Sequence, residues 1–163
     1  MKKRVYIETS IVSYLAARPS ANLVTRARQK ITRDWWQEQR DFFDLYASQF
    51  VLDEAGDGDP DAARARLRVL ATLPGVPLTA QAVAQAREIV DEGLLPPNAG
   101  GDAMHLALAT VHNMNVLLTW NCRHLANAVI LGVIGRFMRI KGYEVPVVCT
   151  PDELSGNAGD LGE

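Results

Sequence analysis

Three acidic side chains and one amide lie at the ends of apolar stretches of this sequence. Glu8 follows VYI, Glu54 ends SQFVLDE, Asp102 opens DAMHLALA, and Asn121 follows LLTW. Carboxylates that come together repel one another, and burying them is costly unless a cation neutralises them. Mg²⁺ takes oxygen ligands and keeps several waters, so a few carboxylates hold it. A divalent ion held in this way lowers the pKa of a water and stabilises charge on a phosphoryl oxygen, which is the chemistry of phosphodiester hydrolysis.

Each of these four residues also has an ordinary structural explanation. Asp102 is suited to capping a helix N-terminus, and Asn121 to a turn or a cap. Glu8 is compatible with a solvated strand end, and Glu54 lies next to several other acids in the run from Asp53 to Asp61. The spacing alone therefore does not decide between a metal site and four unrelated polar residues.

The elements that would position these residues alternate between short β-rich runs and helical stretches. Such alternation indicates crossover connections and a mainly parallel sheet of about five strands, covered by helices on both faces. Function in such sheets lies beyond the carboxyl ends of the strands, where Glu8 and Asn121 are expected. The expected strands are Arg4 to Ile7, Phe42 to Ala47, Val76 to Leu78, Asn115 to Trp120 and Val145 to Thr150. The main expected helices are Ser10 to Ala17, Ala21 to Asp41, Ser48 to Glu54, one from Pro60, one from Thr79, Asp102 to Asn113 and Arg123 to Lys141.

Length and composition indicate one ordinary globular domain. The 163 residues suit one domain at 1–151, followed by an acidic, Gly-rich C-terminal tail at 152–163. A net charge of −2 argues against binding nucleic acid through bulk charge, although a local basic patch remains possible. Neither a signal peptide nor an apolar run long enough to span a bilayer is expected, and two cysteines without metal spacing suit a reducing compartment. We therefore expect a cytoplasmic protein without membrane contact.

Several other functions lack their sequence signatures. The acids from Asp57 resemble a calcium loop, but Ala62 stands where glycine is required and Arg68 where glutamate is required. There is no phosphate-binding G-x-x-x-x-G-K-[ST] loop and no G-x-S-x-G nucleophile elbow. A phosphatase of the haloacid-dehalogenase type needs D-x-D after the first strand, where this sequence has ETS.

Four segments resemble the sequence blocks of the PIN domain family, most closely its bacterial VapC-like branch. They are YIETSIVSYL, FVLDEAGDGD, GDAMHLALA and NVLLTWNCRHL, and the likeness spans residues 4 to 150. The resemblance implies a three-layer α/β/α sandwich and an endoribonuclease that depends on Mg²⁺ or Mn²⁺. It also implies the toxin of a type II toxin–antitoxin pair, which binds a cognate antitoxin protein and forms a homodimer.

The resemblance assigns roles to individual residues. Glu8, where the family usually has aspartate, would hold the metal with Glu54 and Asp102, and Asn121 stands where many members have a fourth acid. Asn121 lacks a negative charge, so we expect one firmly held metal ion. The hydroxyls that match the family around these positions, expected to orient the ligands, belong to Thr9, Ser10 and Thr119.

Two alternatives to the RNA nuclease stay open. Because Asn121 replaces an acid, the protein would instead be a weak or inactive PIN-like module that binds RNA or protein. The same site would also serve a structure-specific DNA nuclease.

Other residues near these segments have two competing interpretations. His105 lies one helical turn after Asp102, and a structural role is favoured over metal binding. Arg123 and His124 would hold a phosphate at a helix start or lie on a solvated turn. The basic segment from Arg18 to Arg40 would follow an RNA backbone or, with its aromatic neighbours, form an antitoxin-binding surface.

Overall fold

The computed structural model describes residues 1–156, and its centre is a parallel sheet of five strands. The strand order is β3-β2-β1-β4-β5, and each neighbouring pair is parallel. The sheet consists of β1 (Lys3–Ile7), β2 (Phe43–Ser48), β3 (Gly75–Val76), β4 (Val116–Leu118) and β5 (Val147–Cys149). This arrangement confirms the predicted α/β class and the number of strands.

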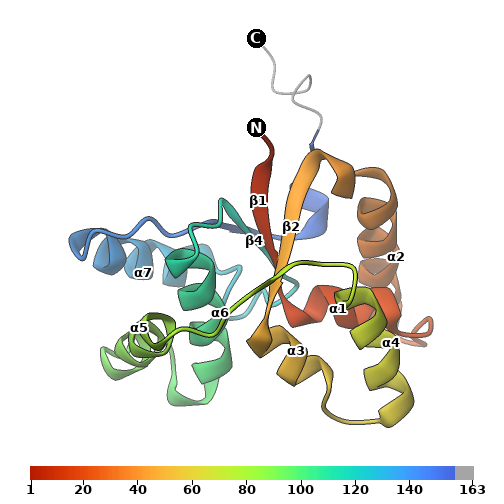
Figure 1. Ribbon diagram of the computed structural model, residues 1–163, viewed down its shortest axis with the longest axis horizontal. Helices are drawn as coiled ribbons and strands as arrows, with labels where there is room; N and C mark the ends of the chain where they lie inside the picture. Colours follow the sequence, from red (N-terminus) through yellow and green to blue (C-terminus); the bar gives the residue numbers. More distant parts are fainter. Residues whose placement is uncertain (157–163) are drawn as a thin grey trace.

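Helices cover the sheet on both sides, which makes the predicted three-layer sandwich (Figure 1). One layer contains α1 (Thr9–Ala16), α2 (Leu23–Glu38), α3 (Gln49–Ala55) and α4 (Pro60–Leu70). The other contains α5 (Ala80–Asp91), α6 (Gly100–Val111) and α7 (Ala128–Ile140). Short 3₁₀ helices occur at η1 (Arg40–Phe42), η2 (Pro97–Ala99) and η3 (Pro151–Glu153).

Local capping explains where several helices begin. The Ser48 side chain accepts a hydrogen bond from Val51 N at the start of α3, and Thr79 caps α5 in the same way. Asp59 caps α4, with Pro60 in its first turn. Proline is tolerated there because its missing N–H would have no partner inside the helix. These three helices begin within one residue of their predicted starts.

Three helices begin two or more residues away from their predicted starts, and the first is α2, which begins at Leu23 rather than Ala21. α6 begins at Gly100, so Asp102 lies inside the first turn and Ala99 is the N-cap without a side-chain hydrogen bond. α7 begins at Ala128 rather than Arg123, because the Asn127 side chain accepts hydrogen bonds from the first amides of the helix. Residues 121–127 form a turn instead.

The register of the two central strands places polar residues side by side at the carboxyl end of the sheet. Ile7 pairs with Leu118, and the next amide, Glu8 N, donates to Leu118 O at 3.1 Å. Glu8 and Thr119 therefore leave the sheet together. The residues before them in β1 and β4 are almost fully buried and anchor this edge in the core.

The C-terminal segment packs on α2 as far as it is described. Trp35 Nε1 donates to Leu154 O at 2.8 Å, and Gly156 N donates to Gln39 Oε1. The rest of the expected tail, residues 157–163, lies outside the described residues. Within residues 1–156, no helix is both long and apolar enough to cross a bilayer.

Candidate metal centre

Glu8 is a buried carboxylate with one engaged oxygen and one open oxygen. It caps α1, and Glu8 Oε2 accepts hydrogen bonds from Ser10 N at 3.0 Å, Thr119 Oγ1 at 2.8 Å and Ser10 Oγ. Only 7% of the residue is exposed. No hydrogen bond to Oε1 occurs among residues 1–156, and this oxygen lies 3.7 Å from His105 Nε2. Three donors thus fix the carboxylate while leaving one oxygen available to a ligand.

Glu54 approaches the same point from the last turn of α3. Glu54 Oε1 accepts a hydrogen bond from Thr9 Oγ1 at 2.7 Å and lies 2.6 Å from His105 Nε2. Burial by itself raises the pKa of Glu54, but the hydrogen bond and charge of His105 and the hydroxyl of Thr9 outweigh it. The net result is a pKa below the ordinary value. Glu54 is therefore ionised when a cation binds near neutral pH.

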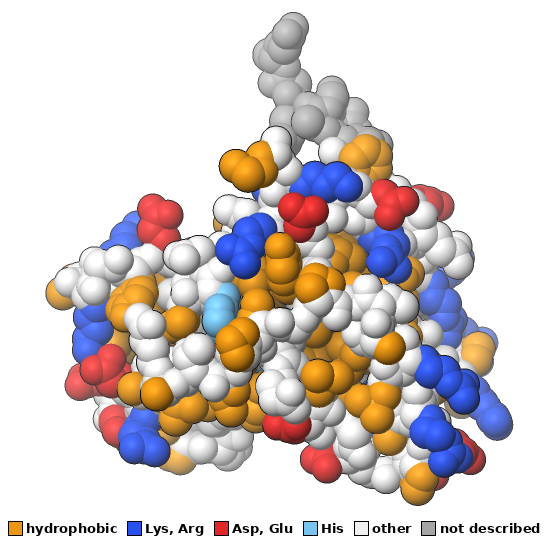
Figure 2. All heavy atoms as spheres, in the orientation of Figure 1, with side chains coloured by type: hydrophobic (Ala, Val, Ile, Leu, Met, Phe, Trp, Pro, Cys, Tyr) orange, Lys and Arg blue, Asp and Glu red, His pale blue; other side chains and the backbone are white. Residues whose placement is uncertain are grey.

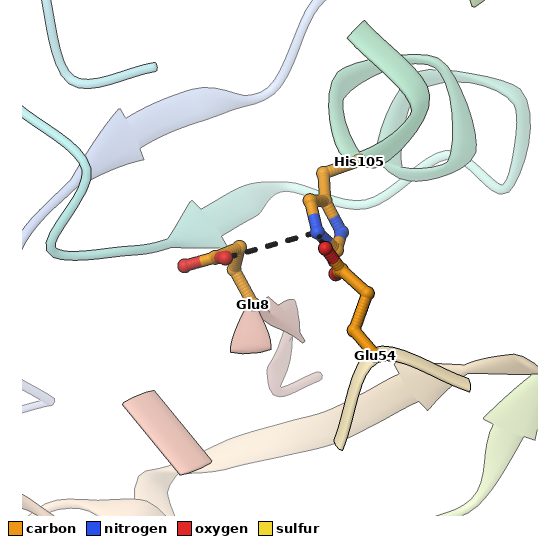
Figure 3. A group of neighbouring side chains, drawn as sticks. All are labelled: Glu8, Glu54 and His105. Carbon is orange, nitrogen blue, oxygen red and sulfur yellow. Dashed lines mark hydrogen bonds and ion pairs between the residues drawn. The ribbon is translucent and has the colours of Figure 1, made fainter. Parts of the chain in front are cut away.

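His105 is the third member of this group, and it comes from α6. Figure 3 shows its imidazole directed toward the two glutamates. His105 is 2% exposed, and its other nitrogen, Nδ1, lies 2.9 Å from the hydroxyl of Tyr6. That hydroxyl also contacts Ser48 Oγ at 2.8 Å. A chain of buried polar contacts therefore fixes the ring orientation.

The three side chains form a donor set that suits a divalent cation. One ligand atom from each of Glu8, Glu54 and His105 lies within 4.8 Å of the others. Adjacent ligands of an octahedral ion with bonds of about 2.0–2.2 Å lie about 2.8–3.1 Å apart, so the 2.6 Å and 3.7 Å separations need side-chain shifts of less than about 1 Å. Two convergent carboxylates, one with an open oxygen, are neutralised by such an ion.

Asp102 belongs to a second polar group, beside the first. Its Oδ1 accepts a hydrogen bond from Asn121 Nδ2 at 2.8 Å, and its Oδ2 lies 2.8 Å from His124 Nδ1. Asn121 Oδ1 accepts in turn from His124 N at 3.1 Å. Within the described chain, the metal-ligand group contains His105 where the sequence suggested Asp102. Asp102 is nonetheless one helical turn from His105 on α6.

Hydroxyl groups connect the two polar groups. Thr119 Oγ1, which donates to Glu8, accepts a hydrogen bond from Asn121 N at 3.0 Å. Ser10 Oγ, which also donates to Glu8, accepts from Trp120 N at 2.9 Å. The turn that carries Asn121 is thereby tied to the carboxylate at the end of β1.

The residues suggested for phosphate binding differ in their surroundings. Arg123 is exposed on the turn before α7, whereas His124 is half-buried against Asp102. Because α7 begins at Ala128, neither residue lies at the start of a helix. The helix-dipole argument for a phosphate at these two positions is therefore wrong.

Several members of the basic segment are engaged within the protein. Arg26 Nε donates to Ser20 O at 2.7 Å, Arg33 donates to Ala17 O at 2.8 Å, and Lys30 pairs with Asp34 at 2.5 Å. Arg28 lies over the Trp120 ring, 5.2 Å from its centroid. Lys and Arg side chains still gather on the side of the molecule where α2 and α4 lie (Figure 2).

Sequence reasoning favoured a structural role for His105 and did not single out Tyr6. The sequence feature that could have indicated a site role for His105 is its position one helical turn after Asp102. Tyr6 carried no signal, because an aromatic residue in a buried strand has an ordinary core role. The pairing of Asp102 with His124 joins residues 22 apart and depends on how the turn after β4 folds.

Comparison with known proteins finds similar structures but no similar sequences. No family model matches the chain, and a search of curated proteins finds no significant match. Several solved structures resemble it, among them three that match over more than two thirds of both chains. VapBC2 from Rickettsia felis, solved bound to a promoter DNA fragment, has a TM-score of 0.56 at 15% identity and covers 90% of this chain and 98% of its own.

The other two structures agree with the first. VapC20 from Mycobacterium tuberculosis, a toxin that cleaves the sarcin–ricin loop, has a TM-score of 0.57 at 17% identity, with 73% and 91% covered. VapBC-1 from nontypeable Haemophilus influenzae has a TM-score of 0.52 at 16% identity, with 91% and 98% covered. The chain therefore has the PIN-domain fold of VapC proteins, as the sequence resemblance implied.

Proposed function

We propose that this protein with a VapC-like fold is a divalent-metal-dependent endoribonuclease and the toxin of a type II toxin–antitoxin pair. The observation that carries the proposal is the convergence of Glu8 and Glu54 at the carboxyl end of the sheet, with one Glu8 oxygen open. Two carboxylates whose ligand atoms lie within 4.8 Å of each other and of an imidazole nitrogen are a donor set that a divalent cation would neutralise. Mg²⁺ and Mn²⁺ are the proposed ions.

When bound, the metal supplies Lewis acidity to a phosphoryl oxygen and lowers the pKa of a water. The protein holds the ligand carboxylates in fixed positions. Ser10 and Thr119 hold the Glu8 carboxylate in one orientation, and Thr9 does the same for Glu54. Such fixed ligands reduce the reorganisation required when the phosphodiester arrives.

Asp102 and Asn121 act beside the two glutamates in this proposal. Both Asp102 oxygens are already engaged, so direct coordination by Asp102 requires giving up the hydrogen bond from Asn121 or the contact with His124. Asn121 would thus control whether Asp102 reaches the metal. Arg123, exposed on the same turn, is proposed to contact the RNA backbone with His124.

The protein partner is proposed from the similar structures and from one exposed surface. Two of the similar structures are of VapBC proteins. The start of α2 exposes Leu23 and Val24 by 77% and 63%, next to the basic residues of that helix. An exposed apolar pair with a charged border suits a protein interface, so we propose that the antitoxin binds here. A cytoplasmic location and a homodimer complete the proposal.

RNA cleavage by the purified protein tests this function. Total RNA and DNA of one matched sequence are incubated with Mn²⁺, Mg²⁺ or EDTA, using wild type, Glu8→Gln and Glu54→Gln. Glu92→Gln is the matched control, because Glu92 is exposed at the end of α5. Discrete RNA fragments that require metal and both glutamates, but not Glu92, are the expected result.

Other outcomes point to the two alternatives. Metal-dependent cleavage of the DNA instead of the RNA would identify a DNA nuclease with the same site. Tight RNA binding without cleavage, equal in wild type and both site variants, would identify a binding module. In that case the hydrogen bond between Asn121 and Asp102 would be part of an inactivated site.

A further inference from the structure

We propose that His105 coordinates the metal through Nε2, so that the centre is a mixed carboxylate–imidazole site that selects a first-row transition ion such as Mn²⁺ over Mg²⁺. The inference rests on the proposed metal dependence and names the class of ion. It concerns a residue whose sequence position favoured a structural role.

Geometry is the first argument for coordination. His105 Nε2 lies 2.6 Å from Glu54 Oε1 and 3.7 Å from Glu8 Oε1. The nitrogen therefore lies within reach of both carboxylates, and an ion held by the two glutamates would meet it. In Figure 3 the three side chains, from β1's end, α3 and α6, converge on one point.

The open oxygen of Glu8 is the second, independent argument. Glu8 is more than nine-tenths buried, and its Oε2 receives three hydrogen bonds while Oε1 receives none from residues 1–156. At 3.7 Å, the imidazole is too far away to satisfy Oε1. This oxygen is the one through which Glu8 can bind a cation that the Glu54 carboxylate and the His105 nitrogen also reach.

The surroundings of His105 allow Nε2 to present a lone pair. An imidazole that binds a metal through Nε2 carries its proton on Nδ1, and the partner of Nδ1 fixes that tautomer. Here the partner is the Tyr6 hydroxyl, which can accept a hydrogen bond from Nδ1 and donate its own proton to Ser48 Oγ.

The competing interpretation is that His105 only supports Glu54. In that arrangement Tyr6 donates to Nδ1, and Nε2–H donates to Glu54 Oε1. This explains the 2.6 Å contact but gives no hydrogen-bond donor to Glu8 Oε1, which lies 3.7 Å from Nε2. Metal coordination explains both observations, which is why we favour it.

A nitrogen ligand changes which ion the site prefers. Imidazole is a good ligand for the transition metals, whereas Mg²⁺ prefers an all-oxygen set and dehydrates reluctantly. Two carboxylates alone would suit Mg²⁺ well. Addition of His105 should therefore raise the affinity for Mn²⁺ more than that for Mg²⁺.

The test is pulsed electron paramagnetic resonance of bound Mn²⁺, which detects a directly coordinated imidazole nitrogen. The chain has three histidines, so every candidate can be replaced in turn: His105→Gln, His112→Gln and His124→Gln. His112 is the matched control, because its ring contacts Pro77 O at the other end of α6. The protein is purified without a histidine tag, and calorimetry gives the Mn²⁺ and Mg²⁺ affinities.

The expected result is a nitrogen coupling that is present in wild type, His112→Gln and His124→Gln and absent in His105→Gln. Mn²⁺ affinity should fall about tenfold or more in His105→Gln, with a smaller change for Mg²⁺. If His105→Gln does not fold, Tyr6→Phe serves instead. It should keep the nitrogen coupling and weaken Mn²⁺ binding by about 10–100-fold, since it removes the group that orients the ring.

Three results would overturn the inference. They are bound Mn²⁺ without nitrogen coupling in wild type, a coupling that disappears only in His124→Gln, or equal Mn²⁺ affinity in wild type and His105→Gln. RNA cleavage is measured separately on the same samples. Metal-dependent cleavage without nitrogen coupling would leave the proposed function intact and reject only the role of His105. Failure to bind either ion would reject both.

Discussion

Replacement of Thr119 by valine should destabilise the protein, because this buried hydroxyl joins the Glu8 carboxylate to the turn after β4. Thr119 is 0% exposed, and its Oγ1 donates to Glu8 Oε2 at 2.8 Å and accepts from Asn121 N at 3.0 Å. Valine has nearly the same shape, so the packing stays and both hydrogen bonds disappear.

The size of the effect follows from the two partners. A hydrogen bond to a charged group contributes about 1.5–3 kcal/mol, and an amide left without an acceptor adds a further penalty. Glu8 Oε2 keeps its two donors from Ser10, so we expect a total near the lower end, about 2 kcal/mol. For a chain of this length, that corresponds to a fall in Tm of about 4–8 °C.

Urea unfolding at pH 7 with EDTA present measures this change. Thr72→Val is the control, because the Thr72 hydroxyl is exposed and donates to the neutral Val69 carbonyl. Its effect should stay within about 0.5 kcal/mol. A double-mutant cycle with Glu8→Gln isolates the charge: next to a neutral amide, the cost of Thr119→Val should fall to about 1 kcal/mol.

Two results would refute this reasoning. One is a Thr119→Val variant as stable as Thr72→Val, which would mean that the hydroxyl does not hold the carboxylate. The other is an unchanged cost in the Glu8→Gln background, which would mean that the two side chains are not coupled.

Three further predictions concern the reactivity of the two cysteine thiols, the loss of stability at acidic pH, and the Asn121 amide near the metal centre. Burial, with two nearby carboxylates, raises the pKa of Cys149 to about 11, so at pH 8 only about one Cys149 thiol in a thousand is ionised. A thiol reagent should therefore modify the exposed Cys122 first, and Cys122→Ser should remove the fast phase, whereas two equal fast phases would contradict this. Because the pKa of Glu54 is lower in the folded state than its ordinary value of 4.5, its ionised form stabilises the fold above that pH. The stability advantage of wild type over Glu54→Gln in urea should shrink as pH falls from about 5 through the folded pKa, and a pH-independent difference would exclude stabilisation by the ionised carboxylate. Asn121→Asp places a carboxylate where an amide now donates to Asp102 at 2.8 Å, so Tm should fall in EDTA and rise more with Mn²⁺ than in wild type; an unchanged Tm in EDTA would show that the two groups do not meet.

The sequence predicted most of the fold because the relevant signals are local. Apolar runs that end in polar residues marked the strands, and the helix starts predicted at Ser48, Pro60 and Thr79 lie within one residue of the observed ones. The starts of α6 and α7 were misplaced, although they too depend on local sequence. Gly100 and Gly101 lie before the predicted start at Asp102 but belong to the first turn of α6, and Asn127, rather than Asn121, caps the next helix.

Sequence reasoning identified only some of the neighbours of each acid. Thr9, Ser10 and Thr119 were expected to orient the ligands, and they do contact the glutamates. Which nitrogen or oxygen faces which carboxylate depends on side-chain directions, and these are set by how α6 packs against β4 and α5.

By itself, the sequence determined that a strand would bring Glu8 to the carboxyl end of a parallel sheet, because hydrophobic patterning and strand–helix alternation require it. Only the tertiary structure decided that Glu8 and Glu54 meet His105 while Asp102 is held by Asn121 and His124. The physical reason is that residues of α6 one turn apart share a face but contact different neighbours. His105 faces the ends of β1 and α3, and Asp102 faces the turn after β4.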